Sequence, residues 1–409
     1  QVDSLSFSFG PKTIYGTLFN TNFVGSFATL MLPLSIAFLL GAKEKKQRII
    51  SAIAVALMIF VWIGCNSRAG YLGVAVAAVF ALWLFRKVLI KHWKISVSLL
   101  AVFVVLLIGL NIVSEGALFK RLKTFNVVEQ INLIKVKDET EFKFEDIELG
   151  KDTISIETNR QILNMKLDNN KLYFLDENNN ELEITRNGNN IKLKDHGKYW
   201  EINKISIPEN YPGVSLTTHW GGTINFYFSQ NGIKILGSGG RIADPIVADR
   251  FEPLDGLEGF MSGRGYIWSR TIPMLETYFI KGAGADNYPI AFPQDDFLAK
   301  LKNGSSASLV IDKPHNMYLQ IGINSGLISV IALIAVWVLY IICSLKLYSR
   351  TAFDSLEKIV GASCLASVIG YLVAAMFNDH IVSVSPLFWI ILGIGTSINI
   401  RLLRKNTEA

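Results

Sequence analysis

The sequence has little cysteine, and its cysteines form neither a metal-binding pattern nor a disulfide pattern. The three cysteines, Cys65, Cys343 and Cys364, lie in or beside apolar stretches and show no metal-ligand spacing. Their number is odd, and their positions suggest no pairing. We therefore expect these side chains to pack as small apolar groups and expect no metal to be bound by the chain.

Charge is also scarce, since 18% of the 409 residues are charged and 50% are hydrophobic. This composition excludes an ordinary soluble enzyme and is typical of a multi-span membrane protein with a polar portion. The net charge of +6 could indicate a nucleic-acid partner. The distribution of the charge argues against one, because lysine and arginine occur in short runs between apolar segments, as in cytoplasmic membrane loops.

Long apolar stretches are abundant. A membrane-spanning helix needs ~20 apolar residues, or somewhat fewer where flanking side chains reach the interface. Seven stretches qualify, at about 23–41, 49–64, 70–85, 95–113, 317–343, 359–377 and 382–400. They predict a mainly α, polytopic membrane protein. We also expect further spans upstream, because the sequence starts at Gln1 without Met or a signal peptide and an odd number of spans puts this residue outside.

The basic residues predict the orientation of the spans. Most alternate connections carry clusters of lysine and arginine, whereas one intervening loop has Arg68 alone and the loop at 378–385 has neither residue. The positive-inside rule places the basic loops and the C-terminus in the cytoplasm and the segment from about 114 to 316 outside. We predict a membrane domain at 1–128 and 317–409, a β-rich insertion at 129–250 and a helical outer loop at 251–316.

The insertion shows short runs of period-two alternation, such as Thr153–Thr158 and Lys171–Leu175, separated by turn sequences such as Asn187-Gly188. This hairpin pattern predicts a small antiparallel β domain outside the membrane. Two histidines, His196 and His219, are isolated within it, and we interpret both as structural. No group of residues in this part indicates catalysis.

Polar residues stand at the outer ends of several predicted spans. Asn20 and Asn22 precede the first span, either as caps and turn formers or as members of a site. Arg68 either reaches lipid headgroups or holds a phosphate, since a guanidinium group makes bidentate contacts to phosphate oxygens and keeps its charge. The spacing leaves both alternatives open for Arg68.

The outer loop contains a second isolated arginine next to glycines. Ser262-Gly263-Arg264-Gly265 leads into a helix predicted from about Tyr266, which we expect to lie along the outer membrane surface and to bend at Pro273. One apolar face of this helix is predicted to consist of Trp268, Ile272, Leu275 and Phe279. Arg264 at its start, beside free backbone N–H groups, makes an anion site. Arg270 serves a similar role or is a surface charge.

His315 and Asn316 stand directly before the fifth predicted span. A lone histidine there can simply be hydrogen-bonded at the interface. Arg68, Arg264 and His315 are, however, all predicted on the same side of the membrane, at or near span ends. Two positive charges beside a histidine suit a reaction in which a lipid-linked diphosphate departs.

At these residues the sequence resembles the O-antigen ligase and O-antigen polymerase family of bacterial membrane glycosyltransferases. Gly16–Phe23 looks like the family's Gly-Thr-x-x-Asn-Pro-Asn-Phe motif, with Thr21 where proline is usual. The other matches are Asn66–Gly70 with its Ser-Arg turn, Ser262–Trp268 followed by Lys281–Gly284, and His315-Asn316 followed by Gly326, with Ser329 where a second glycine is frequent. The resemblance covers the spans and residues 251–329 but not the β insertion.

The resemblance implies a GT-C-like membrane fold with about twelve spans in the complete set. It implies transfer of a glycan from an undecaprenyl-diphosphate donor to a glycan, lipid or protein acceptor at the outer face of the plasma membrane, without metal, nucleotide sugar or another cofactor. Carried over, Arg68 and Arg264 would bind the diphosphate and His315 would activate the acceptor hydroxyl or assist departure of the diphosphate. Arg270, Asn316 and Asn22 would be supporting residues. Polymerase and ligase activities both stay open.

Two other classes of function remain as alternatives. A transporter or flippase of lipid-linked sugars predicts charged or broken helices at mid-membrane, and the spans have almost no ionisable residue in their centres. A membrane-anchored receptor would act through the β domain, and it leaves the arginines and the histidine without a role.

Overall fold

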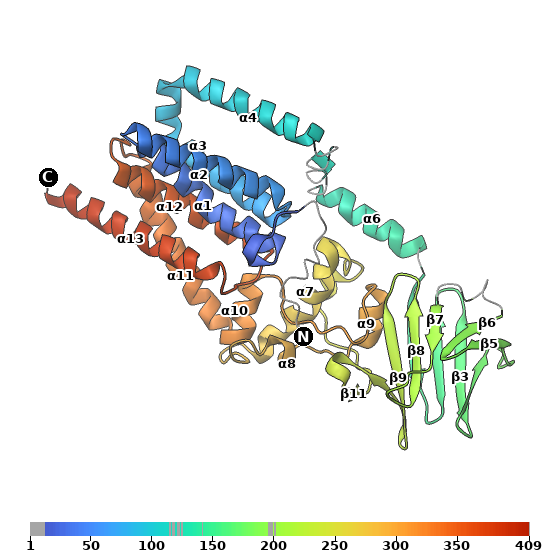
Figure 1. Ribbon diagram of the computed structural model, residues 1–409. Helices are drawn as coiled ribbons and strands as arrows, with labels where there is room; N and C mark the ends of the chain where they lie inside the picture. Colours follow the sequence, from blue (N-terminus) through green and yellow to red (C-terminus); the bar gives the residue numbers. More distant parts are fainter. Residues whose placement is uncertain are drawn as a thin grey trace. The chain divides into compact units, whose positions relative to one another are not determined.

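The computed structural model describes residues 13–113, 116, 119–120, 123, 126–140, 142–194, 199 and 202–408 (Figure 1). The chain forms two compact units. We call residues 1–127, 315–322 and 326–409 the helical unit, and residues 128–314 with 323–325 the β unit. Each unit is described by itself.

The helical unit contains most of the predicted spans. After a short 3₁₀ turn η1 (Gly16–Leu18), its helices are α1 (Thr21–Gly41), α2 (Lys45–Gly64), α3 (Arg68–Lys91), α4 (Trp93–Val113), residues 317–322 of α10 (Met317–Ser325), α11 (Leu327–Tyr348), α12 (Leu356–Ala374) and α13 (Ser385–Glu408). Among the described residues, six helices are long and apolar enough to cross a membrane, namely α1, α2, α3, α11, α12 and α13. These apolar helices indicate a membrane-embedded protein. Helix α4 occupies the predicted span at 95–113 but is not one of the six.

The span predicted at 317–343 is wrong as one continuous helix. It is divided into α10 and α11 at Gly326, whose backbone has φ 93° and ψ 151°. Only glycine adopts this region without steric strain, so the break is encoded at this position. The sequence pattern identifies Gly326 only as a motif residue and does not predict the break.

Glycines set the spacing between α1, α3 and α12. A Cβ atom on Gly70 would lie 2.6 Å from the Cα of Gly25, and a Cβ on Gly73 would lie 2.9 Å from the carbonyl oxygen of Gly370. The Thr29 hydroxyl donates to the carbonyl oxygen of Gly25 at 2.9 Å, on its own helix. Small residues of this kind let apolar helices approach closely. The contact at Gly25 and Gly70 brings the N-terminal ends of α1 and α3 together.

The β unit confirms the predicted antiparallel β domain. Helix α6 (Val127–Thr140), all but its first residue, forms the start of this unit, whereas the sequence predicts β structure from residue 129. One sheet has the order β1-β2-β3-β4, and the other has the order β11-β10-β9-β8-β7-β6-β5. The strands are β1 (Phe144–Leu149), β2 (Thr153–Thr158), β3 (Ile162–Asp168), β4 (Lys171–Leu175), β5 (Ile184–Asn187), β6 (Asn190–Leu193), β7 (Ile202–Ser206), β8 (Gly213–Thr218), β9 (Thr223–Ser229), β10 (Gly232–Leu236) and β11 (Ile242–Ala243).

Asparagine and glycine close the tight hairpins, as the sequence predicts. Asn169 and Asn170 have φ of 46° and 62° between the paired residues Asp168 and Lys171. A two-residue turn with positive φ at both positions matches the twist of the flanking strands. Gly188, with φ 59°, lies in the corresponding turn between β5 and β6.

The predicted boundary between the β insertion and the outer loop at 250/251 lies inside one compact unit. Beyond that boundary follow η3 (Glu252–Leu254), α7 (Phe260–Thr277), α8 (Tyr288–Ala291) and α9 (Phe297–Lys302). Both sheets share one hydrophobic core, which also contains Phe297, Leu301 and Ala307 from the outer loop. Phe297 is 0% exposed. The outer loop therefore completes the core of the β domain, a long-range contact that the alternation pattern of the strands does not reveal.

Candidate functional site

His315 stands directly before the N-cap of α10, in a left-handed backbone conformation. Its φ is 52°, in the left-handed region, and Asn316 is the N-cap of α10. The Asn316 side-chain oxygen accepts hydrogen bonds from the backbone N–H groups of Tyr318 at 2.9 Å and Leu319 at 3.1 Å. Asn316, predicted as a possible supporting residue, is thus the cap that fixes the first turn after the histidine.

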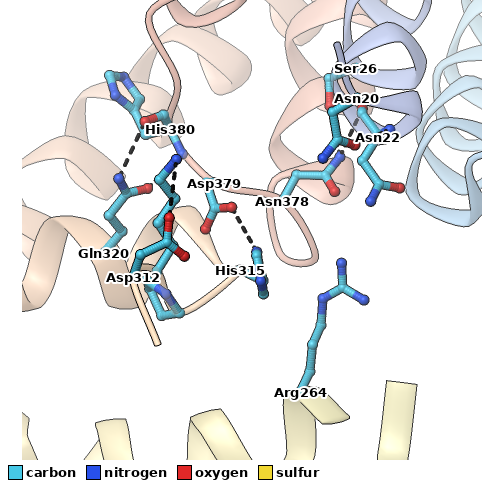
Figure 2. A network of polar contacts seen from close by, with 12 residues as sticks. Asn20, Asn22, Ser26, Arg264, Asp312, His315, Gln320, Asn378, Asp379 and His380 are labelled. Carbon is cyan, nitrogen blue, oxygen red and sulfur yellow. Dashed lines mark hydrogen bonds and ion pairs between the residues drawn. The ribbon is translucent and has the colours of Figure 1, made fainter. Parts of the chain in front are cut away.

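The imidazole of His315 is paired with a carboxylate from a distant part of the chain. His315 Nδ1 lies 2.8 Å from Asp379 Oδ2 (Figure 2). The His315 side chain is 41% exposed, whereas the Asp379 side chain is 3% exposed. With Nδ1–H donating to the buried carboxylate, the ring's other nitrogen, Nε2, is its hydrogen-bond acceptor.

Asp379 belongs to the loop Ala375–Val384 between α12 and α13, and neighbouring residues fix this loop on both sides of it. Asn378 Nδ2 donates to Ser26 Oγ at 2.8 Å and to the carbonyl oxygen of Asn22 at 3.3 Å. On the other side, the backbone N–H of His380 donates to Gln320 Oε1 at 2.7 Å, and Gln320 Nε2 donates to the carbonyl oxygen of His380 at 3.3 Å. Burial lowers the pKa of the His380 side chain.

The same contacts reach the turn that carries Arg68. Arg68 is the first residue of α3, and Ser67 is the N-cap of this helix. The Ser67 hydroxyl donates to Asn22 Oδ1 at 2.9 Å and accepts from the backbone N–H of Gly70 at 3.2 Å. A path of hydrogen bonds therefore runs from Ser67 through Asn22 to Asn378, the residue before Asp379. Helix α1, the arginine turn and the His315–Asp379 pair meet at one end of the helical unit.

Asn20 and Asn22 combine the two roles that the sequence left open. Asn20 is the N-cap of α1, and its side-chain oxygen accepts from the backbone N–H of Asn22 at 2.8 Å. Asn22 is also a member of the polar path at the site. Figure 2 shows both side chains beside Asn378.

Arg264 belongs to the β unit and is described within that unit. It follows three residues with positive φ, Met261, Ser262 and Gly263 (51°, 63° and 86°), so the regular part of α7 begins at Arg264. Its Nη1 donates to the carbonyl oxygen of Met261 at 3.0 Å. The structure thus places Arg264 at a helix start, as predicted.

The alternative that Arg270 is a surface charge is wrong, because its guanidinium group is buried and paired with a carboxylate. Its side chain is 6% exposed, and Nε donates to Asp296 Oδ2 at 3.0 Å. Its Nη1 donates to Ser269 Oγ at 2.7 Å, and the guanidinium carbon lies 4.9 Å from the ring centroid of Tyr266. Burial raises the pKa of the Asp296 carboxyl, and Arg270 opposes that shift. Arg270 is therefore an interior side chain of the β unit, paired with a buried carboxylate.

The buried face of α7 also differs from the predicted one. Tyr266, Ile267 and Thr271 are buried, whereas Phe279 is 47% exposed and lies after the end of the helix. The observed buried face differs from the predicted one because Arg270 and its partners lie in the interior. An apolar repeat cannot reveal a buried charged residue. Trp268 is half-buried, and its Nε1 donates to the carbonyl oxygen of Pro314 at 2.8 Å.

The sequence prediction missed Asn378, Asp379 and Gln320. A signal was present, since Asn378-Asp379-His380 is a run of three polar residues between two apolar stretches. In the sequence, the lack of lysine and arginine in that loop predicts only the orientation of the spans. Gln320 lies one helical turn after Asn316, on a helix that the sequence predicts as part of a continuous span. His196 lies outside the described residues. His219 is exposed and makes an edge contact with Trp220 at 4.7 Å between ring centroids, and the site does not contain it.

No group of three or more histidine, cysteine, aspartate or glutamate side chains lies close enough to hold a metal ion within the described part of the chain. No family model, curated protein or solved structure matches the chain. The chemistry of the site is therefore read from its own residues. They are a half-exposed imidazole with a buried carboxylate behind it, joined by hydrogen bonds to a turn that begins with an arginine.

Proposed function

We propose that the protein is a membrane glycosyltransferase. It transfers or polymerises a glycan from an undecaprenyl-diphosphate donor onto an acceptor at the outer face of the plasma membrane. The observation that carries this proposal is the 2.8 Å contact between His315 Nδ1 and the buried carboxylate of Asp379. A half-exposed imidazole oriented by a buried carboxylate is the arrangement of a general base.

In the proposed reaction, His315 Nε2 takes the proton from an acceptor hydroxyl as the hydroxyl oxygen attacks the anomeric carbon of the donor. The new C–O bond forms while the bond between the anomeric carbon and the diphosphate oxygen breaks. Undecaprenyl diphosphate leaves with the bonding electrons. Asp379 orients the ring and stabilises the imidazolium ion, which then returns its proton to water.

Arginine side chains are proposed to hold the departing diphosphate. Arg68 begins α3, and Ser67 beside it is hydrogen-bonded to Asn22 and through it to the loop of Asp379. A guanidinium group offers a bidentate contact to phosphate oxygens and stays charged throughout the reaction. Arg264, at the start of the regular part of α7, is proposed as a second ligand of the diphosphate.

The test is reconstitution of the full chain in proteoliposomes with a synthetic undecaprenyl-diphosphate oligosaccharide. Variants are His315→Ala and, as a matched control, His92→Ala, which removes an exposed histidine at the opposite end of α3. We expect wild type and His92→Ala to form longer glycans or a glycosylated acceptor, and His315→Ala to lose ~10²–10⁴-fold in rate. Equal turnover by His315→Ala and wild type would contradict the role of His315.

A transporter or flippase of lipid-linked sugars is a second candidate, because the predicted span is broken at Gly326 into α10 and α11. Broken helices are typical of transporters. The two candidates differ in what the donor becomes. Movement of the intact donor across the bilayer by both wild type and His315→Ala, without release of undecaprenyl diphosphate, would favour the transporter.

A further inference from the structure

Asp379 makes one hydrogen bond, to His315, and the described part of the chain offers no partner to its other oxygen. Oδ2 lies 2.8 Å from His315 Nδ1, whereas Oδ1 is buried without a hydrogen-bond partner among the described residues. A carboxylate held by a single contact can rotate or swing away with its loop. The direction of this carboxylate therefore has to come from its backbone.

The backbone on both sides of Asp379 is fixed by buried side-chain amides. Gln320, 7% exposed, pairs with the N–H and C=O groups of His380, at 2.7 Å and 3.3 Å. Asn378, 4% exposed, donates to Ser26 and Asn22 of α1. Figure 2 shows the amide contacts on both sides of Asp379, with the carboxylate directed at His315.

We propose that Asn378 and Gln320 are positioning residues that hold the Asp379 carboxylate against His315 Nδ1, and thereby keep the ring in the tautomer with a free Nε2 lone pair. The partner of one imidazole nitrogen sets the protonation of the other. Gln320 comes from the helix that His315 precedes, so only a short stretch of chain separates the base from one of the two amides. This proposal rests on the proposed function for its kinetic consequence, but its structural content can be measured without any activity.

A buried asparagine elsewhere in the helical unit provides a matched control. Asn399 of α13 is 5% exposed, and its Nδ2 donates to Ser344 Oγ at 2.7 Å, a bond of the same kind as that from Asn378 to Ser26. Its side-chain oxygen accepts from the Tyr348 hydroxyl at 2.7 Å. Asn399→Ala removes a buried amide of the same kind from a place without contact to Asp379 or His315. It therefore separates a loss of stability from a loss of positioning.

The experiment uses the full chain with ¹⁵N-labelled histidine, in wild type and in the variants Asn378→Ala, Gln320→Ala, Ser26→Ala and Asn399→Ala. The His315 ring signals are identified by their absence from His315→Ala, and their ¹⁵N shifts report the tautomer. We expect Nδ1–H in wild type and Asn399→Ala, and a mixture of tautomers in Asn378→Ala and Gln320→Ala. Ser26→Ala deletes one oxygen atom and tests the Asn378 contact if Asn378→Ala does not fold.

Rates of glycan transfer give the second readout. We expect Asn378→Ala and Gln320→Ala to lower kcat about 10-fold or more, with the KM for the donor changed little, because a misplaced base slows the chemical step. Asn399→Ala should retain the wild-type kcat. The proposal would be overturned if both amide variants kept the single Nδ1–H tautomer and the wild-type kcat. It would also be overturned if Asn399→Ala changed the tautomer and kcat as much as they do. If wild type transfers no glycan but the tautomers change as described, the proposed function fails and the positioning role stands.

Discussion

Gly70 touches Gly25 through the backbone, and a Cβ atom on Gly70 would lie 2.6 Å from the Gly25 Cα. This contact joins the N-terminal ends of α1 and α3, which carry Asn22 and Arg68. The close approach of two helices therefore determines the geometry of the polar end of the helical unit.

Gly70→Ala should separate α1 from α3. We expect a loss of stability of about 1–3 kcal/mol, the usual cost of overpacking, together with reduced glycan transfer. Gly393→Ala is the control, because a Cβ on Gly393 meets nothing within 4 Å. Thermal unfolding in detergent measures the difference. Equal unfolding temperatures for the two variants would show that the contact does not matter.

Arg68→Lys should weaken donor use although the charge is kept. A lysine cannot reproduce the two parallel contacts of a guanidinium group, and loss of one charge-assisted hydrogen bond costs about 1.5–3 kcal/mol, which corresponds to roughly 10- to 150-fold in rate or affinity. Steady-state kinetics with the undecaprenyl-diphosphate donor measures the effect. Arg86→Lys, in the same helix, should behave as wild type. Normal kinetics of Arg68→Lys would rule out a bidentate contact at Arg68.

Asp379→Asn should lower kcat on the order of 100-fold, within the range of general acid–base catalysis. The amide keeps the size of the side chain but removes the charge that stabilises the imidazolium ion, and it can present an N–H group to Nδ1. Single-turnover measurements separate this slower chemical step from donor binding. A variant with full activity would show that His315 does not act through Asp379.

Burial of Lys300 should make the stability of the β unit depend on pH. The residue is 0% exposed, and its Nζ donates to the carbonyl oxygen of Leu309 at 2.6 Å and to Gln294 Oε1 at 3.3 Å. Burial lowers the pKa of Lys300 from 10.5 to about 8. The unfolded chain therefore binds the proton more tightly, so stability should rise as the pH increases from about 8 to about 10.5, with no contribution to the slope below this window.

Lys300→Met should remove this rise, whereas Lys171→Met, at an exposed lysine, should leave it unchanged. The measurement is the urea midpoint of the β unit in the full chain. After equilibration at each pH, a hydrogen-exchange pulse at one fixed pH reports the unfolded fraction. If the stability of Lys300→Met rises with pH by the same amount as that of wild type, other groups cause the rise.

Phe297→Ala should destabilise the β unit by about 3–5 kcal/mol, the cost of removing a buried aromatic ring. Phe297 is 0% exposed within the core of the two sheets, whereas Phe279 is 47% exposed. Phe279→Ala is therefore the control, with little change expected. The same urea experiment measures both variants. An unchanged midpoint for Phe297→Ala would mean that the outer loop folds apart from the sheets.

The sequence by itself determined the apolar helices and the hairpins. Both follow from local rules, because ~20 apolar residues suffice to form a span and positive-φ asparagine or glycine suffices to close a two-residue turn. It also identified His315 and Arg68 as isolated polar residues beside apolar stretches. The resemblance to O-antigen ligases and polymerases stays a prediction.

The tertiary structure alone decided which residues act together. Asp379 lies 64 positions after His315 in the sequence and contacts it only because α10 and the loop after α12 meet. Arg270 is a possible anion ligand by its sequence position, but its guanidinium is bonded to the buried Asp296. Phe297 lies within the segment predicted as an outer loop, yet its ring belongs to the core of the two sheets. Such pairings depend on long-range packing, for which hydropathy and motif spacing in one sequence carry no information.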